Sequence, residues 1–196
     1  LSLSAIMSFD GVEMKKTHPL FLELKEHSKE IHTYDSILSL LHWDQETHMP
    51  SGGASARSQQ IALLSKRVHE EKTSKRFKSR LEKLIHLNTG TPKIKDLTKP
   101  ELISLREWRK SFLRDTKLPA SFVEEFSQVT SEATQIWAIA KKDNNFKLFA
   151  PFLQKILDLS RKKSEILGFD DHPYDPLLQC HEPCMTTQKV GAIFSD

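Results

Sequence analysis

The chain has 196 residues, 28% of them charged, and a formal net charge of only +3. This length allows one large or two small domains with a buried core, so an enzyme is not excluded, but the weak charge argues against a dedicated nucleic-acid binder. Two cysteines are too few for a disulfide framework, and no apolar run reaches the ~18 residues that span a bilayer. We therefore expect a protein of the cytoplasm that is not embedded in a membrane.

The first 16 residues are expected to be an N-terminal extension whose true start the sequence does not define. Leu1 is not a methionine, and Met7 and Met14 follow closely. No basic region precedes the apolar residues of this segment, so we do not expect a secretory signal. Thr17 before His18-Pro19 predicts the cap of the first long helix, because proline fits the first turn, where amides lack intrahelical partners.

Long helices are predicted for most of the remaining chain. Stretches 20–49, 54–89 and 120–150 contain neither glycine nor proline, and their apolar residues recur every three or four positions. Period-two alternation is nowhere sustained. One helix is expected to follow Leu118-Pro119 and another to follow Phe149, with Gly168 as a stop. The fold class expected is all-α, built from long helices.

Two segments, 88–100 and 168–186, have the composition of connections, and neither is long enough to demand a separate domain. A last helix is predicted after Thr186-Thr187. Its apolar residues Val190, Ile193 and Phe194 cover only about two turns, which is marginal for a helix in isolation. We accordingly expect residues after Thr186 to be loosely held and the chain alone to associate or to need a partner.

The stretch HWDQETHMPSGG, residues 42–53, is the richest candidate for a functional site. On a helix, His42 and Glu46 share a face one turn apart, although two ligands are too few for a closed metal site. Trp43 continues an apolar side and is equally compatible with the core. A structural or substrate-wall role is therefore favoured over metal binding.

Other potential ligands are weaker. The two His-Glu pairs, in HEEKT (69–73) and HEPCM (181–185), both lack the second histidine of the zinc-peptidase motif His-Glu-x-x-His. His69 is expected on a solvated helix face. Cys180, His181 and Cys184 lack a fourth ligand. The six basic residues of stretch 72–83 surround Phe77 and Leu81, which predicts a solvated helix with a buried stripe rather than a phosphate-binding face.

The stretch ILSLLHWDQETHMPSGGASARSQQIALLS, residues 37–65, resembles the N-terminal region of the carboxypeptidase Taq family of zinc metallocarboxypeptidases. Members carry a similar series of Trp-Asp-Gln-Glu-Thr, Met-Pro, Gly-Gly and Ala-x-Arg. Four further stretches match the same family in the same order: TKLPASFVEEF, residues 133–137, NNFKLFAPFLQKILDLSRKKSEILG and PYDPLLQCHEPCMT. The resemblance runs from about Pro19 to Asp196, so residues 17–196 are expected to be the N-terminal helical portion of such an enzyme, truncated at its C-terminal end.

The resemblance implies a helical protein with a deep groove that releases single residues from peptide C-termini. In the family, zinc is bound by His-Glu-x-x-His and a downstream glutamate, which lie beyond the matched region. No catalytic or metal-binding residue is therefore carried over, and neither activity nor a cofactor is expected for this chain alone. The candidates carried over for the substrate groove are His42, Trp43, Asp44, Gln45, Tyr174 and Asp175.

A departure from the family pattern occurs where members usually read Asp-x-Tyr-Glu-Pro-Gly and this chain reads Gln179 to Cys184. A glycine after proline often serves a turn with positive φ, which cysteine adopts at a cost. This pattern is compatible with a fragment, with one half of a split gene and with the product of a degraded gene.

The resemblance implies a peptide substrate for the intact enzyme and, as partners, a C-terminal half or a second copy in a homodimer. The alternative is a free-standing helical module that binds peptides or proteins without catalysis. Nucleic acid is not favoured as a partner, because the basic residues of 72–83 keep the spacing of an ordinary amphipathic helix.

Overall fold

The computed structural model describes residues 17–195, so the expected extension of residues 1–16 lies outside the described part. The described residues form helices and turns, with one isolated β-bridge between Ile85 and Pro92 and no strand, which confirms the all-α prediction. In chain order the elements are α1 (Pro19–Thr47), the 3-10 turn η1 (Ser51–Gly53), α2 (Ala54–Lys72), α3 (Lys75–Leu84), α4 (Lys99–Asp115), α5 (Ala120–Lys142), α6 (Phe146–Leu167), α7 (Asp175–Leu178) and α8 (Thr187–Ser195).

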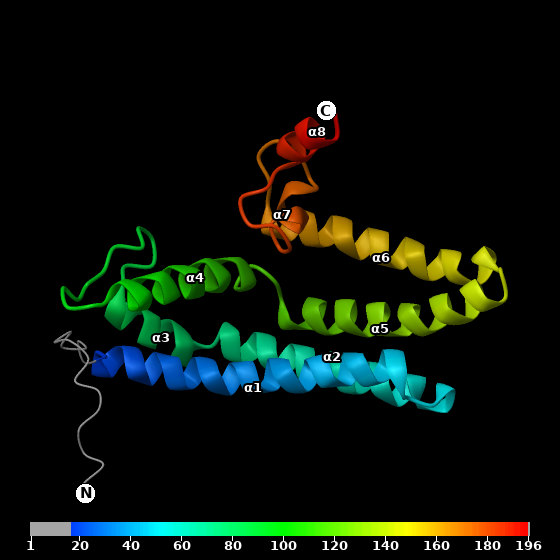
Figure 1. Ribbon diagram of the computed structural model, residues 1–196, viewed down its shortest axis with the longest axis horizontal. Coiled ribbons are helices and arrows are strands. Elements are labelled where there is room, and N and C mark those ends of the chain that lie inside the picture. Colours follow the sequence, from blue (N-terminus) through cyan, green and yellow to red (C-terminus); the bar gives the residue numbers. More distant parts are fainter. Residues whose placement is uncertain (1–16, 196) are drawn as a thin grey trace, which may run out of the picture.

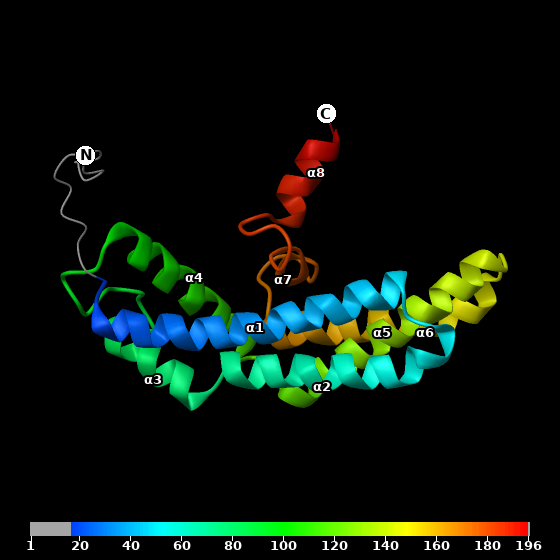
Figure 2. The ribbon, with the colours of Figure 1, turned by 60° about the horizontal axis from the view of Figure 1, so that its bottom comes forward.

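The helices form two antiparallel hairpins that share a face. Helices α1 and α2 run side by side in opposite directions, joined by η1, and α5 packs along α2 (Figure 1, Figure 2). Helix α6 then returns along α5. Helices α3 and α4 lie at the end of α1 where the described chain begins, and α7 and α8 project from the C-terminal end of α6, the end nearer to α4 (Figure 1, Figure 2).

The first helix begins one residue later than the sequence predicts. Its N-cap is His18 rather than Thr17, and the Nδ1 atom of His18 accepts a hydrogen bond from the Leu20 amide at 3.2 Å. An imidazole nitrogen at this position replaces the hydroxyl that we expected, because Pro19 already occupies the first helical position. The backbone amide of His18 donates to the Glu101 carboxylate at 3.1 Å, which ties the start of α1 to the start of α4.

Two stretches that lack glycine and proline are nevertheless interrupted. Ser74 caps a new helix by accepting a hydrogen bond from the Phe77 amide, so residues 54–89 contain two helices instead of one. In residues 120–150 the break falls at Asn144, whose φ of 49° lies in the left-handed region that asparagine tolerates. A side-chain cap at Ser74 and a left-handed backbone at Asn144 therefore separate helices within stretches that lack glycine and proline.

Helix α6 begins at Phe146, four residues before the expected start after Phe149, and continues through Pro151. Pro151 lies inside the helix, beyond the first turn, so the Lys147 carbonyl lacks its usual intrahelical donor. At the other end, Gly168 has a φ of 78° and its amide donates to the Ser164 carbonyl. The prediction of a glycine stop at this position is confirmed.

The main core lies between α1, α3, α4 and the end of α2. Phe21 stacks against Trp108 with ring centroids 5.4 Å apart, and Phe77 stacks against Phe112 at 6.1 Å. Phe77 and Leu81 are buried, as the stripe in residues 72–83 predicts. The buried apolar residues of this cluster are Phe21, Leu24, Ile31, Val68, Phe77, Leu81, Leu84, Ile85, Leu97, Leu105 and Phe112.

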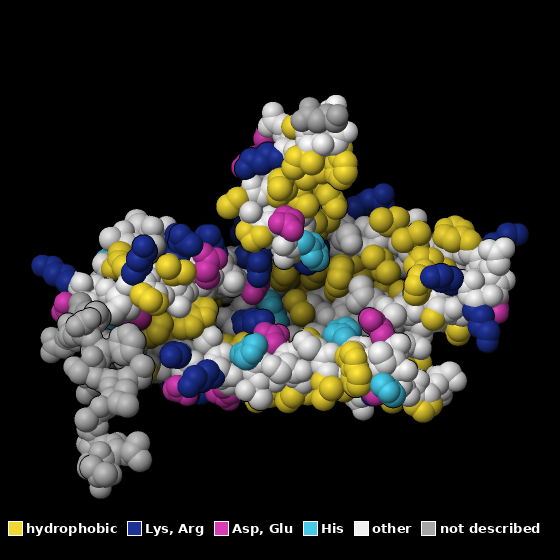
Figure 3. Space-filling model, in the orientation of Figure 1, with side chains coloured by type: hydrophobic (Ala, Val, Ile, Leu, Met, Phe, Trp, Pro, Cys, Tyr) yellow, Lys and Arg dark blue, Asp and Glu magenta, His cyan; other side chains and the backbone are white. Residues whose placement is uncertain are grey.

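Helix α8 forms as predicted, but it contributes no buried residue. Phe194 is 85% exposed, and Ile193 is also largely exposed. Apolar side chains gather on the visible surface of α8 and along α6 (Figure 3). These two helices therefore leave apolar surface in contact with solvent.

Among the described helices, none is long and apolar enough to cross a membrane.

Candidate functional site

The C-terminal end of α1 carries the first block of candidate residues, and its members divide into two inward and two outward side chains. Gln45 is 7% exposed and points toward α5. Its Nε2 atom donates to the Ser131 carbonyl at 2.9 Å, and its Oε1 atom accepts from the Ser131 hydroxyl at 2.8 Å. Gln135 donates to the Gln45 carbonyl at 3.4 Å. Gln45 is thus a buried polar link between the two hairpins.

Asp44 holds the start of α2. Its Oδ2 atom lies 2.7 Å from a guanidinium nitrogen of Arg57, and a second nitrogen of that guanidinium donates to the Leu41 carbonyl at 2.8 Å. Both groups are partly shielded from water. Because Arg57 binds one side chain and one carbonyl of the last α1 turns, it fixes the angle at which α2 leaves η1.

His42 and Trp43 point outward. Trp43 is 54% exposed, which contradicts the interpretation of this residue as core, and its ring packs against His48 with centroids 5.1 Å apart. Helical periodicity places positions 43 and 45 on different faces of α1, so the face that buries Gln45 leaves Trp43 in solvent. His42 and Glu46 are both exposed. The block therefore has a buried bracing side and an accessible side.

The second block lies at the start of α7. Asp175 accepts hydrogen bonds at Oδ1 from the amide of Thr187 at 2.7 Å and from its hydroxyl at 2.5 Å. These hydrogen bonds hold the pKa of the Asp175 carboxyl below its ordinary value, with the hydroxyl of Thr187 contributing most. Asp175 thus serves the start of α8 as an N-terminal cap would. Tyr174 beside it is exposed, and its amide donates to Nδ1 of His172 at 3.1 Å.

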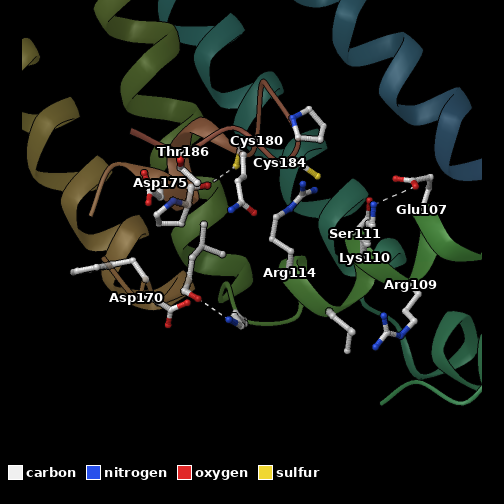
Figure 4. Close-up of a pocket in the computed structure, with 18 of the residues that line it drawn as sticks. Glu107, Arg109, Lys110, Ser111, Arg114, Asp170, Asp175, Cys180, Cys184 and Thr186 are labelled. Carbon is white, nitrogen blue, oxygen red and sulfur yellow. Dashed lines mark hydrogen bonds and ion pairs between the residues drawn. The ribbon is translucent and has the colours of Figure 1, made fainter. Parts of the chain in front are cut away.

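A cavity of about 730 Å³ lies between α4 and the segment from Gly168 to Thr186. Its walls carry Arg114 of α4 and, on the opposite segment, Asp170 and Asp175 (Figure 4), together with Lys117 from the turn after α4. Asp175 is the one residue of the two candidate blocks that lines it. The structure therefore does not bring the α1 block and the α7 block together around this cavity.

A smaller cavity of about 290 Å³ was not anticipated from the sequence. It lies among α2, α5 and the end of α4, with walls that include Val68, Phe122 and Phe126. His69 also lines it, although we expected this residue on a solvated helix face. It is only 7% exposed, with Nε2 2.8 Å from the Leu118 carbonyl. The expectation was wrong because α5 and the loop before it cover that face of α2, a long-range contact that the local pattern does not reveal.

The potential metal ligands of the described residues are scattered and do not form a cluster. The described residues contain no group of three histidine, cysteine or carboxylate side chains positioned to hold an ion. Cys180 and Cys184 are free thiols, and His181 is exposed. The residues at hand therefore do not fit a zinc site, and no chemical step through a metal is assigned to them.

The turn at Cys184 has the geometry that the departure from the family pattern predicts. The Met185 amide donates to the Glu182 carbonyl at 3.1 Å, Pro183 occupies the second position of this turn, and Cys184 has a φ of 69°. Proline followed by a residue with positive φ is the arrangement of a type II turn, which favours glycine at the third position. Cysteine adopts this conformation with strain.

The described structure is thus an all-helical scaffold with a polar brace between its hairpins and no metal ligands of its own. Residues 23–196 match the model of the carboxypeptidase Taq (M32) metallopeptidase family, and the chain belongs to this family. The match covers nearly all of the described helices.

Individual relatives agree with this assignment. The chain is 29% identical over 185 residues to thermostable carboxypeptidase 1 of Thermus thermophilus, covering 90% of this chain and 36% of the relative. It is 33% identical over 156 residues to thermostable carboxypeptidase 1 of Pyrococcus furiosus, covering 80% of this chain and 30% of the relative. A solved structure named "BsuCP Crystal Structure" superposes with a TM-score of 0.83 at 27% identity, covering 91% of this chain and 35% of that one. The chain spans about a third of the length of these relatives.

Proposed function

We propose that this chain forms one wall of the peptide-binding groove of a zinc-dependent metallocarboxypeptidase that releases C-terminal amino acids. The observation that carries the proposal is the superposition with a TM-score of 0.83 over 91% of the chain, because it relates the whole described scaffold to one part of a longer family protein. The zinc ligands and the general base are assigned to residues outside the 196 of this sequence.

In this proposal the two candidate blocks have divided roles. Gln45 and Asp44 brace α1 against α5 and α2, since both are engaged in hydrogen bonds or an ion pair within the scaffold. Trp43 and His42 present an accessible surface for a peptide, and a half-exposed indole supplies apolar contact area at low cost in conformational entropy. Tyr174 has the same accessibility in the second block.

The exposed apolar residues support a further partner for this wall. Phe146, Phe169, Ile193 and Phe194 are all exposed, and they belong to α6, α8 and the segment between them. Exposed apolar surface of this kind favours association. We assign this surface to contacts with the remaining part of the enzyme, supplied by a C-terminal half or by a second copy, in the cytoplasm.

The experiment measures zinc content and peptidase activity of the isolated chain. After dialysis against a zinc-containing buffer, the chain should retain only traces of metal and release no C-terminal amino acids from test peptides. Near-stoichiometric zinc together with release that a chelator abolishes would overturn the proposal.

The same preparation separates the proposal from the free-standing module. Binding of a hydrophobic dye and concentration-dependent association are expected if α6 and α8 lack their normal contacts. A monodisperse monomer that melts cooperatively and binds no dye would favour the module.

A further inference from the structure

The two cysteines of the chain open onto the same cavity. Cys180 and Cys184 both line the 730 Å³ cavity beside α4, and both are free thiols (Figure 4). Cys184 is exposed, whereas Cys180 is half-buried and its Sγ donates to the Pro176 carbonyl at 3.4 Å. The proposed function gives neither thiol a role.

The backbone between them is compact. Helical turning continues after α7, because the Glu182 amide donates to the Leu178 carbonyl at 2.8 Å. The chain then reverses at the turn closed by Met185 and Glu182, which places Cys184 at its third position. Closing a loop of so few residues costs little entropy. One thiol is thus reachable from solvent and the other lies four residues away on the same cavity wall.

We propose that Cys180 and Cys184 are a redox-active pair that a peroxide oxidises to an intramolecular disulfide. The exposed Cys184 sulfur, as thiolate, attacks a peroxide oxygen: an S–O bond forms, the O–O bond breaks, and hydroxide leaves and takes up a proton as water. The Cys180 sulfur then leaves the Pro176 carbonyl and attacks the sulfenic sulfur. An S–S bond forms, the S–O bond breaks, and a second water leaves. The two thiols lose two electrons and two protons, and hydrogen peroxide takes these up as it is reduced to two waters.

Oxidation would act on the attachment of α8. Helix α8 has no buried residue, and its start is held by Asp175 through Thr187. A further link to the preceding segment is the bond from Lys189 Nζ to the Cys184 carbonyl at 2.8 Å. A disulfide between positions 180 and 184 would fix the turn that provides this carbonyl.

The test treats the full chain with hydrogen peroxide and maps the tryptic peptide 164–189, which contains both cysteines and no internal cleavage site. This peptide should lose about 2 Da, and a thiol reductant should restore its mass. Oxidation of Met185 adds an oxygen and is therefore distinguished by its mass. Cys180→Ser should instead give a sulfenic or higher acid at Cys184, and Cys184→Ser should leave Cys180 largely reduced.

A control in concentrated urea separates the folded turn from mere closeness in sequence. The disulfide should form several-fold faster in the folded chain than in urea. Equal or slower formation in the folded chain would overturn the proposal, and so would independent over-oxidation of both thiols or disulfides only between molecules.

Discussion

Gln45 and Ser131 exchange two hydrogen bonds across the interface of α1 and α5, at 2.9 and 2.8 Å, although 86 positions separate them in sequence. Both residues are buried. The side-chain amide of Gln45 and the hydroxyl of Ser131 thus find partners where water does not reach, so the pair fixes the register of one hairpin on the other. A substitution that removes the Gln45 amide leaves the buried Ser131 hydroxyl without this acceptor.

Gln45→Ala should therefore lower the free energy of unfolding by roughly 1–3 kcal/mol, because the Ser131 groups lose their partner in a buried position. Urea unfolding followed by circular dichroism measures the change. Glu46→Ala is the matched control, since Glu46 is the exposed neighbour on the same turn, and it should change stability by less than about 0.5 kcal/mol. Equal effects of the two substitutions would show that the buried pair does not stabilise the interface.

Cys184→Gly should leave stability unchanged or raise it by up to about 1 kcal/mol, because glycine adopts a positive φ without strain. Cys184→Ala separates this effect from loss of the thiol, since alanine keeps the strain of a side chain at a φ of 69°. Thermal melts of the three proteins give the comparison. If the glycine variant melts at a clearly lower temperature than the alanine variant, the turn does not impose the strain inferred here.

Glu101 should make stability depend on pH. Burial raises the pKa of its carboxyl, but hydrogen bonds from Thr98 and from the amide of His18 outweigh burial and hold that pKa below its ordinary value. The contribution of Glu101 to the free energy of unfolding is therefore fully present above the pKa of about 4.3 that its carboxyl has in the unfolded chain. This contribution is lost as pH falls through the lower pKa of the folded state.

Glu101→Gln tests this contribution. Because Glu101 is only 4% exposed and completes the capping box of α4, the variant should lose about 1–2 kcal/mol at neutral pH. The difference from the wild-type chain should shrink as pH falls below about 4. A difference that stays constant from neutral to acid pH would mean that the charge of Glu101 is not involved.

Asp175→Ala should release the start of α8, because Thr187 then loses both hydrogen bonds to that carboxylate. Amide hydrogen exchange in residues 187–195 should speed up, while exchange in α1 and α2 stays the same. Asp171→Ala is the control, since Asp171 is an exposed acidic neighbour. Unchanged exchange in α8 of the Asp175 variant would show that the helix is held by other contacts.

The sequence predicted the helical class and the glycine stop at Gly168, because apolar spacing and glycine report local backbone preference directly. It did not predict the break at Ser74, where a side chain caps a new helix, and it placed the boundary between the helices after Pro119 and after Phe149 later than the structure does. The positive φ of Cys184 was expected from the family resemblance, because Cys184 stands where members have a glycine after proline, and the structure confirms it.

The environment of single side chains was less predictable. His69 was expected in solvent and Trp43 was compatible with the core, yet the first is buried and the second exposed. Which face of a helix is covered depends on packing of α5 against α2, and contacts between such distant segments leave no local periodic signal. The family resemblance located both candidate blocks, but it did not reveal that Asp44, Gln45 and Asp175 are engaged within the scaffold.

The most direct test of the groove wall is the kcat/KM of a chimera in which residues 23–196 replace the matched part of the Thermus thermophilus relative. A folded, zinc-loaded chimera should release C-terminal residues, and Trp43→Ala combined with Tyr174→Ala should lower kcat/KM at least several-fold without loss of zinc. If the folded, zinc-loaded chimera is inactive, or if it cleaves peptides equally well without these two side chains, the exposed faces of the two blocks are not a substrate-binding wall.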